Sequence, residues 1–147
     1  MTGTGDDSQL NADAQRLEML DHDECVSLLR HGGYLGRVAV LADDGRPVIL
    51  PVNYTIDEEA VVFCTAAGTK LDAILGGADL AFEVDANRPL HHSGWSVLVR
   101  GVAEIVTDRA AVARLQAGPL RPWVKGAMTN WIRLPLDEIS GRRLPEI

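Results

Sequence analysis

A strictly alternating segment around residue 50 limits the possible folds of this chain more than any other stretch. Its large side chains recur at every second position, over Val48, Leu50, Val52, Tyr54 and Ile56. Successive side chains of a strand point to opposite faces, so this spacing predicts a strand with one apolar face. Pro51 has no backbone N–H, so we expect it at an edge, at a bulge or where no strand lies alongside.

The neighbouring segments predict hairpins with this strand. A strand is expected over 34–41, before the turn Asp43-Asp44-Gly45, and residues 60–65 return the chain after Asp57-Glu58-Glu59. Since hairpins join antiparallel strands, we expect the sheet to be antiparallel.

The second half of the chain predicts three more strands, over 80–85, 95–106 and 131–136, with 142–144 extending or adding to the last. Gly101 marks a bend of the kind found at barrel corners, and residues 87–94 are expected to form a loop. A mainly β chain of about six short antiparallel strands with short helices favours a small barrel.

Three short helices complete the prediction. Asp21 and Glu24 form a capping-box-like pair before an apolar run that ends at Gly32-Gly33, which indicates a helix over 22–31. The others are predicted over 69–75 and, after Asp108, over about 109–116.

The length of 147 residues predicts one domain, over 15–147, preceded by a flexible tail of small polar residues over 1–14. The net charge of −7 argues against nucleic-acid binding, which needs a basic face. Two cysteines are too few for a disulfide framework or a four-ligand zinc site. The sequence shows neither a membrane-spanning apolar run nor a signal peptide, so we expect a cytoplasmic protein without a membrane partner.

A candidate phosphate site follows the strand over 60–65. Gly68 permits close backbone approach, Thr65 and Thr69 offer hydroxyl groups, and Lys70 offers a positive charge at a helix N-terminus. The alternative is an ordinary helix start with Lys70 in solvent. Both interpretations are open on spacing alone.

The common catalytic motifs are absent from the sequence. It contains no Gly-x-Gly-x-x-Gly after a strand, no Walker loop and no Gly-x-Ser-x-Gly, and no catalytic residue can be named. His91-His92 lies in a polar loop, where neighbouring side chains point apart, so we expect a surface loop and no metal site. Cys64, beside the candidate phosphate site, is either redox-active or a buried inert thiol.

Several strings, in this order and spacing, resemble a known family. They are Leu35-Gly36-Arg37-Val38-Ala39, Ile49-Leu50-Pro51-Val52-Asn53-Tyr54, Phe63-Cys64-Thr65 through Lys70-Leu71, Phe82-Glu83-Val84-Asp85, Gly94-Trp95-Ser96-Val97-Leu98-Val99-Arg100-Gly101, Trp131-Ile132-Arg133 and Ile139-Ser140-Gly141-Arg142-Arg143. Over about residues 17–144 the chain resembles the pyridoxamine 5′-phosphate oxidase-like superfamily. The resemblance implies a six-stranded antiparallel split β-barrel with a few short flanking helices.

The resemblance also implies FMN, bound at the interface of a homodimer. The strand facing the flavin ring would be Val48, Ile49, Leu50, Pro51, Val52 and Asn53, and the phosphate would be held by Thr65, Thr69 and Lys70. Further contacts would come from Ser96, from Trp95 as a wall, and from Arg121, Trp123 and Trp131 of the second subunit. Each tryptophan has an alternative role as filler of the core or of the dimer interface.

Departures from the family pattern argue against oxidation of vitamin B6. The C-terminus has no Arg-x-His, Asn53 stands where the oxidases carry a Lys, and the helix after Asp108 lacks a matching Tyr–Arg–Ser set. The expected function is therefore FMN-dependent oxidation or reduction of another small molecule. The alternatives are a non-catalytic protein that binds, stores or senses a flavin, deazaflavin or haem, and a cofactor-free dimeric interaction module.

Overall fold

A computed structural model describes residues 17–66, 68–121 and 130–144 of the chain, without the Thr69 side chain. The strands are β1 (Glu18–Leu20), β2 (Leu35–Leu41), β3 (Pro47–Asp57), β4 (Ala60–Thr65), β5 (Asp79–Arg88), β6 (Ser93–Val102), β7 (Glu104–Ile105), β8 (Asn130–Pro135) and β9 (Glu138–Leu144). The helices are α2 (His22–His31), α3 (Thr69–Leu75), α4 (Arg109–Ala117) and the 3-10 helix η1 (Pro89–His91).

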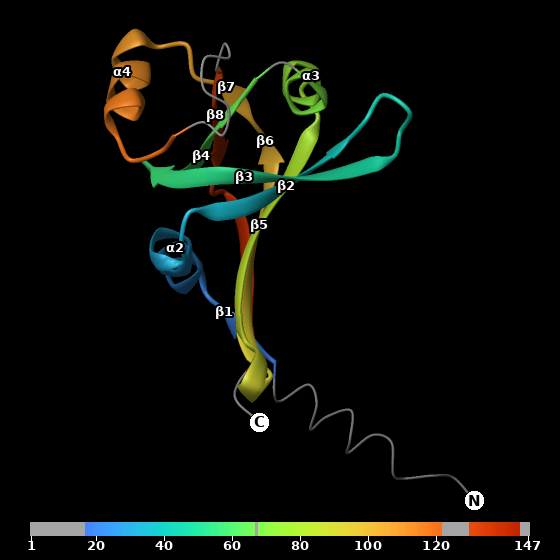
Figure 1. Cartoon of the computed structure of the whole chain (residues 1–147), viewed down its shortest axis with the longest axis vertical. Coiled ribbons are helices and arrows are strands. Elements are labelled where there is room, and N and C mark those ends of the chain that lie inside the picture. The colour runs from blue at the N-terminus through green and yellow to red at the C-terminus, as the bar shows by residue number, and fades with distance from the viewer. Residues whose placement is uncertain (1–16, 67, 122–129, 145–147) are drawn as a thin grey trace, which may run out of the picture.

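The strands form one curled sheet in the order β1-β9-β6-β5-β2-β3-β4-β8-β7. Every pair in it is antiparallel. In Figure 1 the long β5, β6 and β9 run downward while β2 and β3 cross them, which gives the sheet its curl. The predicted class, a mainly β antiparallel split barrel with a few short helices, is confirmed.

The strand count is a correction, because the described residues contain nine strands where about six are expected from the pattern. β1 and β7 are too short to show an alternating pattern. β9 alternates only weakly because its central inward position is Gly141, where a Cβ would come within 2.6 Å of Cys25 Sγ. Because α2 packs closely against the sheet here, only glycine fits at this position, and the apolar side chain that would complete the alternating pattern is missing.

The predicted loop over 87–94 is also corrected. β5 continues to Arg88 and β6 begins at Ser93, so the two strands form one long hairpin with only η1 at its end. His92 closes this turn in the left-handed region, at φ 46°. The segment is polar because the end of the hairpin is exposed to solvent, although its residues on both sides of η1 are still paired as strands.

The predicted helices and bends are confirmed. Asp21 caps α2 by accepting a hydrogen bond from the Glu24 amide at 2.8 Å, and Asp108 caps α4 by accepting from the Ala111 amide at 3.0 Å. Gly101, at φ 154°, is the second-last residue of β6, and β7 begins directly after Ala103. These local signals correctly set the ends of the elements.

The main core fills the inside of the curled sheet and includes Phe63, Phe82 and Ile132, with Leu29 of α2 against it. A smaller cluster of Val62, Leu115, Leu120 and Trp131 holds α4 on the other side of β4 and β8. No helix in the described segments is long and apolar enough to span a membrane.

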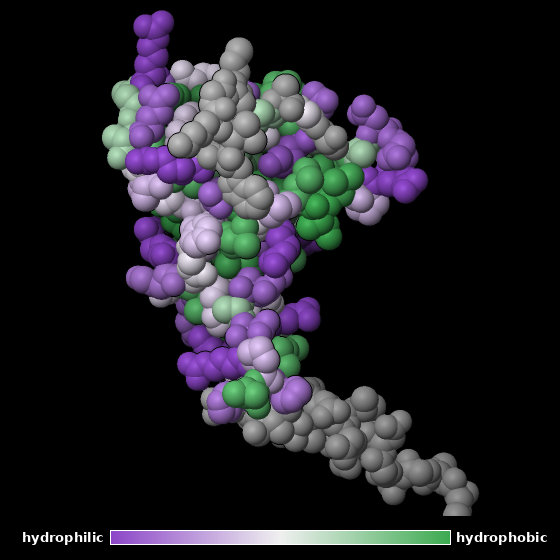
Figure 2. Space-filling model, viewed as in Figure 1, coloured by the Kyte–Doolittle hydropathy of each residue, from purple (hydrophilic) through white to green (hydrophobic). Residues whose placement is uncertain are grey.

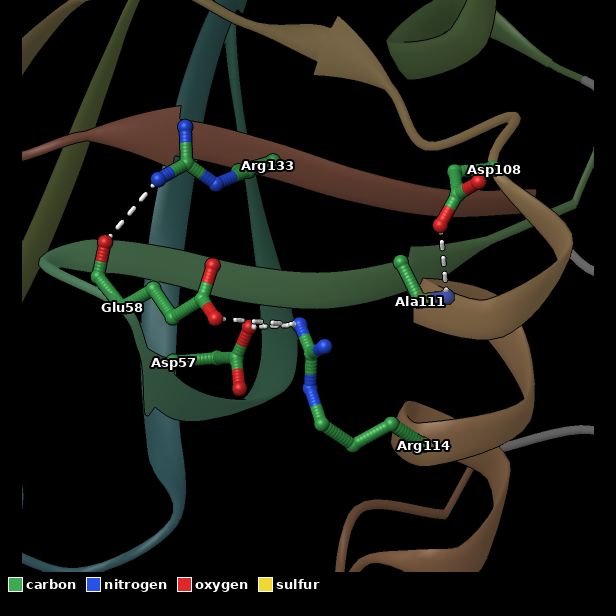
Figure 3. A network of polar contacts seen from close by, with 6 residues as sticks. All are labelled: Asp57, Glu58, Asp108, Ala111, Arg114 and Arg133. Carbon is green, nitrogen blue, oxygen red and sulfur yellow. Dashed lines mark hydrogen bonds and ion pairs between the residues drawn. The ribbon is translucent and has the colours of Figure 1, made fainter.

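An ion pair joins α4 to the turn between β3 and β4 (Figure 3). Arg114 donates to the Asp57 carboxylate at 2.9 Å and lies 3.9 Å from Glu58 Oε1. Arg133 of β8 donates to the Glu58 carbonyl at 2.9 Å, so this turn is held from two sides. Glu58 and Glu59 both adopt positive φ there, as a tight hairpin turn requires.

Candidate functional site

β3 changes its partner halfway along its length. It pairs with β2 from Pro47 to Asn53, but with β4 only from Tyr54 to Asp57. The first half therefore has a strand on one side only within the described part of the chain, and Pro51 lies in this half, as its missing N–H predicts. We call the place where β3 and β4 separate the split, with Asn53 on one side and Thr65 with the start of α3 on the other.

The predicted ring-facing residues divide between the two faces of β3. Val52 is buried, Val48 and Leu50 are half-buried, and Ile49 is 67% exposed. The outer face of β3 thus presents Ile49, Pro51 and Asn53, while the inner face contributes to the core. Only the outer set is available to a ligand that lies on this face of the strand.

Asn53 is the most unusual polar residue of the described chain. Its Nδ2 donates to the carbonyl of Arg121 of the same chain at 3.4 Å, whereas the resemblance implies a contact from Arg121 of the second subunit. Its Oδ1 is buried and has no hydrogen-bond partner among the described residues. Buried acceptors are normally paired, so an orphaned one at the end of a paired segment indicates a place for a donor.

On the other side of the split, Thr65 is only 5% exposed, and its hydroxyl donates to the Ala66 carbonyl at 3.1 Å. Gly68 has φ 149°, and no atom lies within 4 Å of the position that a Cβ would take. The backbone at Gly68 is therefore open to an approaching group, as the predicted phosphate site requires.

Lys70 carries the charge at this site. Its side chain is half-buried, and no carboxylate pairs with it in the described segments. Loss of solvent around the ammonium group lowers the pKa of Lys70 below its ordinary value. A bound phosphate would supply the missing negative charge and reverse that shift.

The remaining predicted residues are spread over the molecule. Ser96 lies on the outer face of β6, opposite Asp85 and Arg142. Trp95 packs near α2, where its Cη2 would be 2.6 Å from a Cβ on Gly32. Trp131 is 6% exposed in the smaller apolar cluster, and Trp123 lies outside the described residues.

A charged cluster on the outer face of the sheet was missed by sequence reasoning. Arg37 lies between Glu83 and Asp85, at 3.4 Å from each carboxylate, and is opposite Pro51 in the register of β2 and β3. Burial, and then the neighbouring Asp85, raise the pKa of Glu83 to about 7. The only signal in the sequence is the alternation of acidic residues along β5, because Arg37 is 46 positions from Glu83.

The other reactive groups do not form a catalytic set at the split. Burial raises the pKa of the Cys64 thiol to about 11, which keeps the sulfur protonated at neutral pH. His22 and His31 lie on α2, and His91 and His92 lie at the end of the β5–β6 hairpin. No group of three metal-binding side chains occurs within the described residues.

The residues present at the split fit a flavin nucleotide. The orphaned Oδ1 of Asn53 can accept from an N–H group of a ring, and the uncompensated Lys70 can hold a phosphate. The open backbone at Gly68 allows a close approach between them. The arrangement can bind an anionic aromatic group, and apart from Lys70, which a phosphate would occupy, its described side chains include no evident acid or base.

Comparisons with known proteins show which family the chain resembles. The family model for pyridoxamine 5′-phosphate oxidase matches residues 21–143. The uncharacterised protein Rv0080 of Mycobacterium tuberculosis is 35% identical over 136 residues, which cover 89% of this chain and 88% of the relative.

Two solved structures extend the comparison. The FAD binding protein from Mycobacterium smegmatis is 37% identical with a TM-score of 0.72, over 87% of this chain and 100% of that chain. The FAD and haem binding protein from the same organism is 21% identical with a TM-score of 0.64, over 86% and 72%, and is similar in fold alone. Because the family model spans most of its length, the chain belongs to the pyridoxamine 5′-phosphate oxidase family, with the split barrel fold of its flavin-binding relatives.

Proposed function

We propose that this chain binds FMN at the split and acts as a flavin-dependent oxidoreductase on a small molecule. The observation that carries the proposal is the pair of uncompensated groups there, the buried Oδ1 of Asn53 and the half-buried ammonium of Lys70. A flavin nucleotide has a ring with an N–H group and a phosphate, so it would satisfy both. The 37% identical protein named for binding FAD supports a flavin.

The bound flavin would supply the hydride or electron transfer. The chain would hold the phosphate with Lys70 and the start of α3, and would lay the outer face of β3 against the ring. With the ring bound, Pro51 and Ile49, which are exposed in the free chain, would exclude water from that face, and Asn53 would contact the polar edge. The departures at the C-terminus and at Asn53 favour a substrate other than vitamin B6.

A homodimer is the second part of the proposal. Ile49, Leu35 and Leu98 lie on the outer face of the sheet and are 67%, 40% and 37% exposed. Figure 2 shows apolar side chains gathered beside the projecting β2–β3 hairpin. Apolar area of this kind favours contact with another protein surface, here a second copy of the chain. Sedimentation equilibrium with added FMN tests this, and a monomer mass would contradict it.

A haem is less well supported than a flavin by the residues at the split. Haem iron is held by His, Cys, Met or Tyr ligands. The histidines of the described residues lie elsewhere, and the raised pKa of Cys64 disfavours a thiolate. Deazaflavin has the same polar edge as a flavin, so it is separated from FMN by its spectrum.

The first experiment is a titration of the purified protein with FMN, FAD and riboflavin, followed by flavin fluorescence. Replacing Lys70 by Ala is expected to weaken FMN binding by about 1.5–3 kcal/mol, or roughly 10- to 150-fold, because a charge-assisted contact is lost. Riboflavin, which lacks the phosphate, should bind the variant and the wild type equally. Arg46→Ala, at the exposed turn between β2 and β3, is the matched control.

Two results would contradict the assignment. An FMN affinity that Lys70→Ala leaves unchanged would remove Lys70 from the phosphate site, and a wild type that binds no flavin would refute the function. Anaerobic mixing of the FMN-loaded protein with NADH or NADPH then separates a reductase, whose flavin bleaches, from a carrier, whose flavin does not.

A further inference from the structure

The side-chain amide of Asn53 has a defined orientation. Nδ2 faces the Arg121 carbonyl at 3.4 Å. A carbonyl oxygen only accepts hydrogen bonds, so a rotated amide would set two oxygens against each other. Oδ1 must therefore face away from Arg121, which is where it is buried without a partner.

The position of Asn53 in β3 explains why no donor of the described residues reaches its Oδ1. Asn53 is paired with Leu35 of β2, and the pairing with β4 begins one residue later, at Tyr54. The amide thus lies where the strand loses one neighbour. Within the described residues, Oδ1 of Asn53 is the sole buried side-chain nitrogen or oxygen atom without a partner.

We propose that Oδ1 of Asn53 accepts a hydrogen bond from the N3–H group at the pyrimidine end of the flavin ring and thereby selects flavin-type rings over haem. This inference rests on the proposed function. The polar edge of a flavin carries a single N–H between two carbonyl groups, and a buried acceptor matches only the N–H. The edge of a haem carries carboxylates and no N–H, so a haem would leave Oδ1 unpaired.

The two sides of the split would therefore recognise different parts of the ligand. Lys70 recognises the phosphate, which many nucleotides share, whereas Asn53 recognises the ring. A site built to hydrogen-bond a particular group rejects an analogue that lacks it, because the buried partner is left unsatisfied. Asn53 is therefore a specificity-determining residue, and its effect should depend on N3–H and not on the phosphate.

The test pairs a change in the ligand with a change in the protein. FMN and its N3-methyl derivative are titrated by fluorescence against the wild type, Asn53→Ala and Asn53→Asp. The wild type is expected to bind N3-methyl-FMN at least about 10-fold more weakly than FMN. Asn53→Ala should weaken FMN binding by about 5- to 30-fold and bind the two ligands with similar affinity. Asn53→Asp keeps an acceptor, so it should still prefer FMN to N3-methyl-FMN, but the oxygen that replaces Nδ2 faces the Arg121 carbonyl and should lower both affinities.

Thr55→Ala is the matched control, because Thr55 is a half-buried polar residue two positions along the same face of β3. It should leave both affinities unchanged. Haemin binding, measured in parallel by absorbance, should not be weakened by Asn53→Ala.

Each contrary outcome is separable from failure of the proposed function. A wild type that binds FMN and N3-methyl-FMN equally overturns the role of Asn53 but leaves flavin binding intact, and this comparison needs no variant to fold. Equal weakening of FMN and haemin by Asn53→Ala overturns it as well, because Asn53 would then support only the scaffold. A wild type that binds no flavin refutes the proposed function and this inference together.

Discussion

Single residues with little space around them decide how closely the strands and the core rings approach. Gly36 is buried in β2, and a Cβ there would come within 2.5 Å of the Phe82 ring. The same ring meets Tyr54 edge to face, with centroids 5.1 Å apart. Glycine at position 36 therefore makes room for an aromatic pair at the centre of the core.

Replacing Gly36 by Ala is expected to destabilise the protein by about 1–3 kcal/mol, because the methyl group overlaps the Phe82 ring and forces it to move. Thermal unfolding should show a Tm lower by about 2–12 °C. Gly76→Ala is the control, since its Cβ would meet only ordinary contacts of 3.4 and 3.6 Å. A Gly36→Ala protein as stable as the wild type would show that the ring has free space.

At the scale of elements, a side chain of strand β3 supplies a hydrogen bond to the last turn of helix α2. Leu29 lies in the last turn of α2, where carbonyl groups lack partners within the helix. The buried hydroxyl of Tyr54, on β3, donates to the Leu29 carbonyl at 2.6 Å. Burial raises the pKa of Tyr54 to about 12, so this hydroxyl remains a donor throughout the neutral range.

Tyr54→Phe is expected to lower the free energy of unfolding by about 1–2 kcal/mol, because the Leu29 carbonyl stays buried without its donor. Amide hydrogen exchange in α2 should speed up more than exchange in β8. Tyr34→Phe, at a side chain that is 70% exposed, should change neither measurement. Equal exchange rates in the two variants would show that the tyrosine hydroxyl does not hold the helix.

At the scale of the whole molecule, the sheet brings together charges that the chain keeps far apart. β2 lies next to β5, so Arg37 meets Glu83 and Asp85 on the outer face. The same face carries the exposed Leu35 and Ile49 and, at the split, Asn53. The titration of Glu83 therefore acts on the surface that the proposed dimer would use.

The raised pKa of Glu83 predicts a pH dependence of stability. Burial and Asp85 favour the protonated form of Glu83 in the folded state. Its contribution to the free energy of unfolding is therefore fully present below pH 4.5 and is lost as the pH rises through about 7. The difference between the Tm of Glu83→Gln and the Tm of the wild type should therefore shift in favour of the variant as the pH rises from 4.5 to about 7. Glu104→Gln, at an exposed residue, is the control. A constant difference in Tm over this range would contradict the prediction.

The sequence was a good guide to the elements and a partial guide to the site. The alternation over 48–56 predicted β3, and the Asp21 and Asp108 caps predicted the starts of α2 and α4. The residue types around Gly68 and Lys70 predicted the start of α3, and their role in holding a phosphate stays a prediction. Whether the predicted contacts of Trp95, Ser96 and Trp131 with a cofactor occur stays a prediction.

The sequence alone determined the periodicity, the caps and the turns, because these depend on interactions among residues a few positions apart. Only the tertiary structure decided that β3 changes partner at Asn53, that Oδ1 of this residue stays unpaired, and that Arg37 meets Glu83. These features depend on which distant strands pair, and that choice is made by packing of the whole core and leaves no local pattern in the chain.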